Sequence, residues 1–107
     1  LPCPDAGGNR RGWFVYVVQL PRGVDRDSVV RALAELGIPS KPYFPAVHLM
    51  SFYRERFGHR EGQFPVCEDV AARSIALPFF AEMTEGQVAQ VGKALASVLE
   101  RLRVRSV

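Results

Sequence analysis

The residues of this chain that are best suited to chemistry gather in one proline-rich segment, residues 38–48, with the sequence IPSKPYFPAVH. The segment holds a cation, a phenol and an imidazole, and its prolines restrict the backbone that carries them. Polar groups on a rigid segment with aromatic neighbours suit the wall of a ligand site. The sequence therefore predicts a binding surface whose candidate residues are Lys41, Tyr43, Phe44 and His48.

A structural interpretation of the same segment is also open at this stage. In it, Tyr43 and Phe44 fill space in the core, and His48 caps the following helix or bonds a backbone carbonyl. One histidine is weak evidence for either interpretation, so the spacing of the residues does not decide between them.

The other reactive side chains favour neither a metal centre nor a nucleophile. Between His48, His59 and Cys67 lie ten and seven residues, which match none of the compact paired spacings of zinc ligands. Two acidic residues follow Cys67 directly and disfavour a reactive thiolate. The basic run in residues 54–60 is interrupted by an acid, and such runs are usually solvated faces rather than phosphate sites.

Length and composition predict an ordinary globular domain. A chain of 107 residues with 48% hydrophobic and 23% charged residues is large enough for one core and too small for two. The formal net charge is +3, and the arginines are scattered over several segments. Because nucleic-acid binding needs a clustered basic stripe, we expect no nucleic-acid partner.

The sequence also lacks the marks of a membrane or secreted protein. The longest apolar run, residues 13–18, is far shorter than the roughly 20 residues that span a bilayer, and no signal peptide is recognisable. Cys3 and Cys67 form no paired motif, which favours reduced thiols. We therefore expect a cytoplasmic protein without a membrane partner. Because the chain begins at Leu1 rather than Met, we also expect it to be a piece of a longer protein.

The first half of the chain is expected to contain a tail, a strand and a helix. Residues 1–12 are rich in glycine and proline and show no periodic apolar pattern, which is typical of a linker or tail. Residues 13–18 are apolar on both faces and predict a central strand. Residues 25–37 predict an amphipathic helix that an aspartate caps and Gly37 closes, with Val29, Leu33 and Leu36 on one face. An edge strand or extended loop is expected around Tyr43 and Phe44.

The second half predicts two short helices, a strand and a long helix. Residues 49–57 precede Gly58 and residues 65–74 begin with a proline, as short helices often do. Residues 75–78 then form a short buried strand. Thr84 and Gln87 have the spacing of a capping box, and an apolar seam follows from Val88 to Leu102. This order of elements predicts an α+β fold in which helices pack on one face of a small, mainly antiparallel sheet.

Taken in order, these pieces resemble the C-terminal part of the DegT/DnrJ/EryC1/StrS aminotransferases. The resemblance runs from about Trp13 to Leu99 through an aromatic strand, an Asp-Arg-Asp helix start, a Gly-Ile pair, the YFPAVH segment, a Leu-Pro pair and a Met-Thr cap. Each piece is weak alone, and the ordered set is specific. It implies that residues 13–107 are the small C-terminal domain of a pyridoxal-phosphate enzyme of the aspartate-aminotransferase fold type.

The resemblance also implies a function. Such enzymes move an amino group from glutamate or glutamine to a keto sugar, often nucleotide-linked, or to a keto cyclitol, and the full-length protein is expected to be a homodimer. The lysine that binds the cofactor lies in the family's large N-terminal domain, and neither Lys41 nor Lys93 stands in that context. The chain alone is therefore expected to hold no pyridoxal phosphate and to be inactive, with the large domain of the same chain as its partner.

Carried onto this sequence, the family pattern places the segment from Ser40 to His48 on the substrate side. His48 is expected to hydrogen-bond a substrate hydroxyl or phosphate or to orient the segment, and Tyr43 and Phe44 to shape the sugar pocket. Lys41 stands where many relatives carry arginine. An arginine can bind a phosphate or carboxylate through two hydrogen bonds, whereas a lysine offers a single point charge. A catalytically silent regulatory or structural module of the same family is the alternative, and a free-standing ligand-binding domain is a third interpretation.

Overall fold

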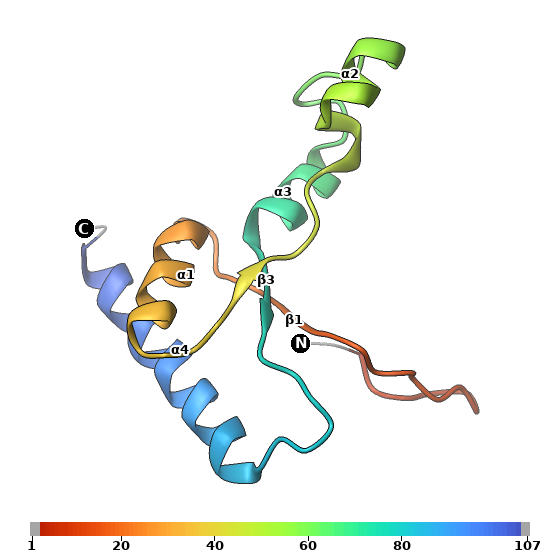
Figure 1. Ribbon diagram of the computed structural model, residues 1–107. Coiled ribbons are helices and arrows are strands. Elements are labelled where there is room, and N and C mark those ends of the chain that lie inside the picture. The colour runs from red at the N-terminus through yellow and green to blue at the C-terminus, as the bar shows by residue number, and fades with distance from the viewer. Residues whose placement is uncertain (1–2, 106–107) are drawn as a thin grey trace.

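Three short strands form one antiparallel sheet in which β3 (Ser74–Leu77) lies between β1 (Tyr16–Gln19) and β2 (Lys41–Pro42). The computed structural model describes residues 3–105, apart from the side chains of residues 104 and 105. Helices α1 (Arg26–Glu35) and α4 (Glu85–Arg105) lie side by side on one face of the sheet (Figure 1). This arrangement confirms the predicted fold class, an α+β domain with a small antiparallel sheet.

The core lies between these two helices and the sheet. Ile75 of β3, Leu33 of α1 and Val98 of α4 are at most 1% exposed and belong to one cluster. The alternation of side chains along a strand puts Val18 of β1, the partner of Ile75, on the same covered face. Val29 and Leu33 of the apolar face predicted for α1 are buried. Leu36, the third predicted residue of that face, is 51% exposed and lies just after the last residue of the helix.

Side chains cap the two core helices as the sequence predicts. The Asp25 carboxylate accepts a hydrogen bond from the Ser28 amide at 2.9 Å, and Gly37 turns the chain with a φ of 74° that other residues rarely adopt. At α4, the Thr84 amide donates to Gln87 Oε1 at 2.9 Å, and the Gln87 amide donates to Thr84 Oγ1 at 3.2 Å. The reciprocal pair is the predicted capping box.

The prediction of a central first strand is wrong. Within the described residues, β1 lies at the edge of the sheet and pairs only with β3, and it begins at Tyr16 rather than Trp13. Apolar residues on both faces of a strand indicate how its faces are covered, and they say nothing about how many strands pair with its edges. Phe14, in the predicted strand, is 80% exposed before β1 begins.

The predicted short helices are present with slightly shifted ends. Helix α2 (Ser51–Phe57) ends at Gly58, which adopts a φ of 68°, and α3 (Pro65–Arg73) begins with its proline. A single 3-10 turn, η1 (Val47–Leu49), precedes α2, which begins at Ser51 rather than at the predicted residue 49. The strand predicted around Tyr43 and Phe44 lies two residues earlier, at β2.

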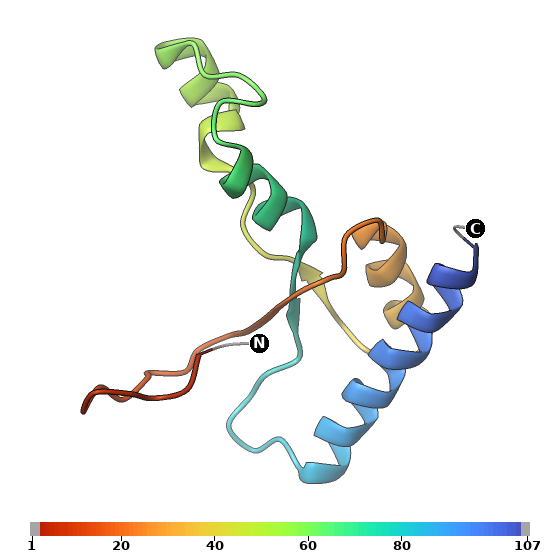
Figure 2. The ribbon, with the colours of Figure 1, turned by 180° about the vertical axis from the view of Figure 1, so that it is seen from behind.

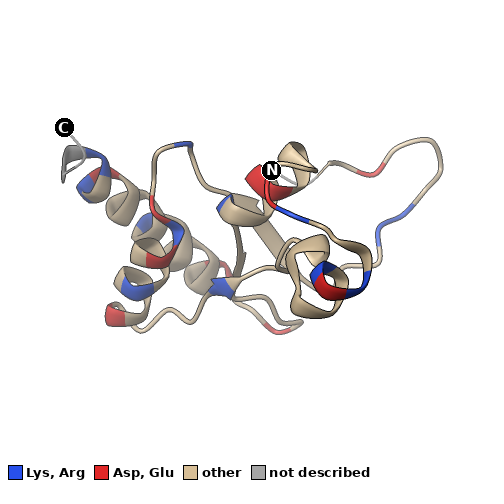
Figure 3. Ribbon diagram, turned by 90° about the horizontal axis from the view of Figure 1, so that it is seen from above, with Lys and Arg blue, Asp and Glu red and all other residues tan. Residues whose placement is uncertain are grey.

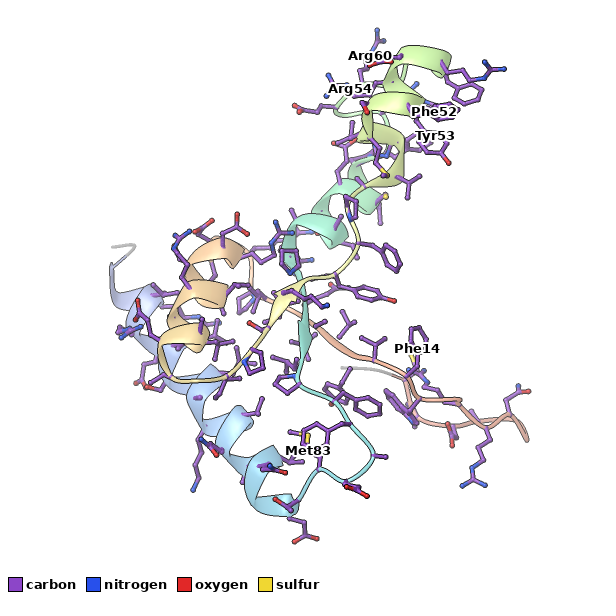
Figure 4. All side chains as sticks on the ribbon, viewed as in Figure 1. Phe14, Phe52, Tyr53, Arg54, Arg60 and Met83 are labelled. Carbon is purple, nitrogen blue, oxygen red and sulfur yellow. The ribbon has the colours of Figure 1, made fainter. Side chains whose placement is uncertain are left out.

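Helices α2 and α3 form an arm that leads away from the core helices. Seen from the front and from behind, the arm and the pair α1 and α4 lie on different sides of the sheet strands (Figures 1 and 2). Phe52, Tyr53, Arg54 and Arg60 lie at the far end of this arm, and Phe14 and Met83 lie on other segments (Figure 4). The aromatic residues Phe52 and Phe57 of α2 are 60% and 58% exposed.

Charged residues are distributed over several elements. Lysine and arginine alternate with aspartate and glutamate on α1, on α4 and on the arm, with no single-sign stripe visible (Figure 3). This distribution agrees with the expectation drawn from the sequence that the basic residues are scattered. None of the helices in residues 3–105 has the length and apolar character needed to cross a membrane.

Arg73 links the end of α3 to the end of β1. Its guanidinium donates to Asp69 Oδ1 at 3.1 Å and Oδ2 at 2.7 Å, and to the Leu20 carbonyl at 2.7 Å. The bidentate pair with Arg73 lowers the pKa of the Asp69 carboxyl below 3.8, and nearby Arg22 adds to the effect. A guanidinium that satisfies both a carboxylate and a strand-end carbonyl fixes the arm to the sheet.

The pair makes the fold sensitive to acid. Because the folded pKa of Asp69 is depressed, its stabilising contribution is complete above the unfolded value and is lost as the pH falls through the folded pKa. We expect Asp69→Asn to lower the thermal midpoint of the natural-length protein at about pH 6 and to flatten its decline towards about pH 3. Glu100→Gln is the control, because the side chain of Glu100 forms no hydrogen bond or ion pair within the described residues. An equally flattened profile in both variants would contradict the role of Asp69.

Candidate functional site

An open hollow of about 590 Å³ lies at the end of the sheet where β2 and β3 meet the N-terminal segment. A volume of this size falls in the range of small-ligand pockets, roughly 300–1,000 Å³. Its walls come from three separate stretches: Phe14 and Val15, then residues 39–44 without Pro42, then residues 76–79. Three of the four predicted site residues, Lys41, Tyr43 and Phe44, lie in this one hollow.

Phe44 has an unusual backbone conformation. Its φ is +37°, and it is the only residue other than glycine with a positive φ among the described residues. A bulky side chain in this region costs about 1–3 kcal/mol, and such strain persists only where surrounding contacts hold it. The ring is 68% exposed and packs edge-on against Tyr43, with centroids 4.7 Å apart. The strained backbone thus presents an aromatic ring to the hollow instead of burying it, and the core-filling role considered for Phe44 does not apply.

Lys41 supplies the charge of the hollow. It is exposed on β2, opposite Ala76 of β3. Beside it, Ser40 Oγ is buried and has no hydrogen-bond partner within the described residues. An unpaired buried hydroxyl costs about 1–3 kcal/mol, so this position favours a partner from outside the described chain. The hollow therefore combines aromatic walls with one cation.

His48 does not lie in the hollow. It is buried in η1, 8% exposed, and its Nε2 lies 2.8 Å from Glu68 Oε1. The imidazole packs edge-on against Phe64, with centroids 4.8 Å apart. Thus the structure brings together Lys41, Tyr43 and Phe44 and places His48 apart from them, beside the arm. The side-chain partner of His48 is the carboxylate of Glu68, whereas the structural interpretation of the sequence considered a backbone carbonyl.

A second, shallower hollow surrounds His48. It is lined by His48, His59 and Cys67 together with Pro45, Val47, Tyr53 and Phe64. The three possible zinc ligands considered from the sequence therefore lie on one surface. Within the described residues, however, no group of three histidine, cysteine or acidic side chains is arranged to hold a metal ion.

Sequence reasoning missed the partners that come from distant parts of the chain. Phe14 and Phe79 form walls of the main hollow, and Glu68 holds His48. The Leu-Pro-Phe-Phe run that follows β3 was a usable signal for Phe79, because apolar residues beyond a strand end often line a pocket. Glu68 carried no signal, since it is one acid on an otherwise ordinary helix.

Comparisons with known proteins match most of the chain. The model of the DegT/DnrJ/EryC1/StrS aminotransferase family matches residues 2–96. Among solved structures, the aminotransferase TlmJ from Streptoalloteichus hindustanus is 25% identical with a TM-score of 0.77, over 95% of this chain and 26% of that one. The putative sugar aminotransferase Spr1654 from Streptococcus pneumoniae, described in its PMP form, is 19% identical with a TM-score of 0.75, over 82% of this chain and 22% of that one.

A third solved structure has the same arrangement. The aminotransferase from Psychrobacter cryohalolentis is 22% identical with a TM-score of 0.62, over 78% of this chain and 22% of that one. The fold is therefore one found in solved aminotransferase structures, and the chain spans about a quarter of the length of the solved structures it matches. The chain belongs to the DegT/DnrJ/EryC1/StrS aminotransferase family.

The family works with pyridoxal phosphate, and the described residues do not fit this cofactor by themselves. A pyridoxal-phosphate site has a lysine for the Schiff base and an aspartate or arginine as partner of the pyridine nitrogen. The chain has two lysines, Lys41 and Lys93. Lys41 is exposed in an open hollow that no acid or arginine of the described residues lines, and Lys93 is exposed on α4 outside the hollows described above. Neither lysine has the surroundings that hold a cofactor.

Proposed function

We propose that residues 13–107 are the substrate-facing small domain of a pyridoxal-phosphate-dependent sugar aminotransferase, and that residues 1–12 are the linker or tail before it. The observation that carries this proposal is the hollow that gathers Lys41, Tyr43 and Phe44 at one end of the sheet. The acceptor is a keto sugar, often nucleotide-linked, or a keto cyclitol, and the amino donor is glutamate or glutamine.

The residues of the hollow suit such an acceptor. Aromatic rings such as Phe44 and Tyr43 pack on the apolar face of a sugar ring, and the Tyr43 hydroxyl can bond a sugar hydroxyl. Lys41 offers a compact positive charge to a phosphate of a nucleotide-linked acceptor. His48 acts indirectly, by orienting the segment that carries these groups.

The chemistry of amino-group transfer belongs to the cofactor, which stabilises the negative charge that forms during the reaction when it is bound. The large domain of the same protein binds this cofactor, and the small domain covers the substrate side. The exposed aromatic residues of the arm and of the hollow then face protein or substrate. The natural-length protein acts in the cytoplasm as a homodimer, without a nucleic-acid or membrane partner, and the 107-residue chain alone is inactive.

Amino transfer by the natural-length protein tests this function. The protein is incubated with pyridoxal phosphate, glutamate or glutamine, and a panel of nucleotide-linked keto sugars and keto cyclitols. We expect the oxo acid left by the amino donor to appear in step with an aminated acceptor, identified by mass spectrometry, and no turnover with residues 1–107 alone.

Cofactor binding separates this proposal from its rival. A natural-length protein that binds no pyridoxal phosphate and aminates none of these acceptors would favour the catalytically silent regulatory or structural module, whereas bound cofactor would count against that module. Turnover by residues 1–107 alone would contradict the proposed division of labour between the two domains.

A further inference from the structure

One carboxylate in the arm joins three parts of the chain. Glu68, near the start of α3, accepts hydrogen bonds from the Gly62 amide at 2.9 and 3.0 Å and from the Phe64 amide at 3.3 Å. Its Oε1 also lies 2.8 Å from His48 Nε2. The Gly62 amide first, and then His48, lower the pKa of the Glu68 carboxyl. Because an ionised carboxylate can only accept, His48 Nε2 carries the proton and donates it.

The segment that bears the candidate site is held at two points. At one end, the Tyr43 amide donates to the Ser74 carbonyl at 3.3 Å. At the other, His48 donates to Glu68. Both acceptors lie on the same stretch of chain, because α3 connects Glu68 directly to Ser74 at the start of β3. Helix α3 therefore acts as a rigid spacer that fixes both ends of residues 43–48.

The strained residue lies between these two points. A φ of +37° at Phe44 is retained only if the surrounding contacts fix the backbone on both sides. The Tyr43 bond fixes the preceding residue. On the following side, Ala46 is 9% exposed and the buried His48 is tied to Glu68, which leaves this side dependent on the carboxylate.

We propose that Glu68 is a positioning residue for substrate, since its carboxylate holds His48 and thereby the strained Phe44 that forms the wall of the hollow. The proposal rests on the proposed function in so far as the hollow binds the acceptor. Glu68 is 21% exposed at its side chain and lies on α3 rather than among the buried residues of the core cluster, so its removal changes the arm without emptying the core.

Hydrogen exchange of the natural-length protein tests the positioning, with Glu68→Ala, Glu68→Gln and the control Glu55→Gln. Glu55 is exposed on α2, and its side chain forms no hydrogen bond or ion pair within the described residues. In Glu68→Ala we expect the amides of residues 44, 46–50 and 62–64 to exchange about tenfold faster or more, with α1 and α4 unchanged. Glu68→Gln keeps one acceptor oxygen, so its exchange rates should lie between those of the parent protein and Glu68→Ala. The exchange rates of Glu55→Gln should match those of the parent protein.

Kinetics add a readout that a purely structural role would not move. We expect KM for the keto-sugar acceptor to rise about tenfold in Glu68→Ala while kcat and the bound cofactor stay near the parent values. His48→Gln, which keeps a side-chain N–H that can reach Glu68, is expected to restore most of the loss that His48→Ala shows. The double variant of Glu68→Ala with His48→Ala is expected to be no worse than the poorer single variant, because both remove one link.

Specific results would overturn the proposal. Unchanged exchange at residues 44–50 in Glu68→Ala would show that Glu68 does not hold this segment in place. Faster exchange there with an unchanged KM shows that the anchor does not position substrate, and a general rise of exchange in α1 and α4 shows that Glu68 only stabilises the fold. If the parent protein aminates no acceptor, the proposed function and the substrate role of Glu68 fail together, and the exchange at residues 44–50 still decides whether Glu68 anchors the segment.

Discussion

Ile75→Ala is expected to destabilise the sheet by about 2–5 kcal/mol, the range for removing a large aliphatic side chain from a packed core. Ile75 is 0% exposed and lies in β3, the strand that pairs with both β1 and β2. Its side chain touches the cluster formed with both core helices. A cavity at this point therefore weakens every layer of the domain at once. The measurement is the opening free energy of the β3 amides, from hydrogen exchange of the natural-length protein.

Two further variants make this result specific. Ile75→Val removes one methyl group and is expected to cost about 0.5–1.5 kcal/mol. Val66→Ala is the surface control, since Val66 is 77% exposed on α3, and it is expected to change the same amides by less than about 0.5 kcal/mol. A loss in Ile75→Ala no larger than in Val66→Ala would contradict the placement of the core between the two helices and the sheet.

The elements that the sequence predicts well are those that depend on neighbouring residues. Asp25 before α1, Gly58 after α2 and the Thr84–Gln87 pair before α4 act within one turn of a helix, so their residue types suffice. The position of β1 in the strand order, edge or centre, depends instead on which strands pair across long loops. Apolar residues on two faces could not reveal that the strand ending at Leu77 would take the central place.

The same distinction applies to the candidate site. Lys41, Tyr43 and Phe44 are close in sequence, and the hollow that they share follows from a rigid proline-containing segment. His48 belongs to the same segment, but its role depends on Glu68, twenty residues away, which turns its ring into the arm. The positive φ at Phe44 has no signal in its residue type, because bulky residues avoid this conformation.

Lys41→Ala is expected to lower kcat/KM for a nucleotide-linked keto sugar by about 10- to 100-fold, the effect of losing one hydrogen bond to a charged group of about 1.5–3 kcal/mol. Lys41 is the one cation among the described residues that line the main hollow. On the exposed chain its charge is screened, and in the proposed arrangement, with a large domain over the hollow, the same charge acts in a drier setting. The decrease in kcat/KM should therefore be much larger for acceptors with phosphate groups than for an uncharged keto cyclitol.

The chain offers its own matched control, because Lys93 is its other lysine and is exposed on α4 away from the hollow. Lys93→Ala removes the same charge from the whole protein and is expected to leave kcat/KM within about twofold of the parent. Lys41→Arg keeps the charge and adds a planar fork, so it should retain most activity towards a phosphate. If Lys41→Ala and Lys93→Ala reduce kcat/KM equally, the effect comes from net charge and Lys41 does not contact the acceptor. If Lys41→Ala impairs the uncharged acceptor as strongly as the nucleotide-linked one, Lys41 shapes the wall of the hollow and does not bind phosphate.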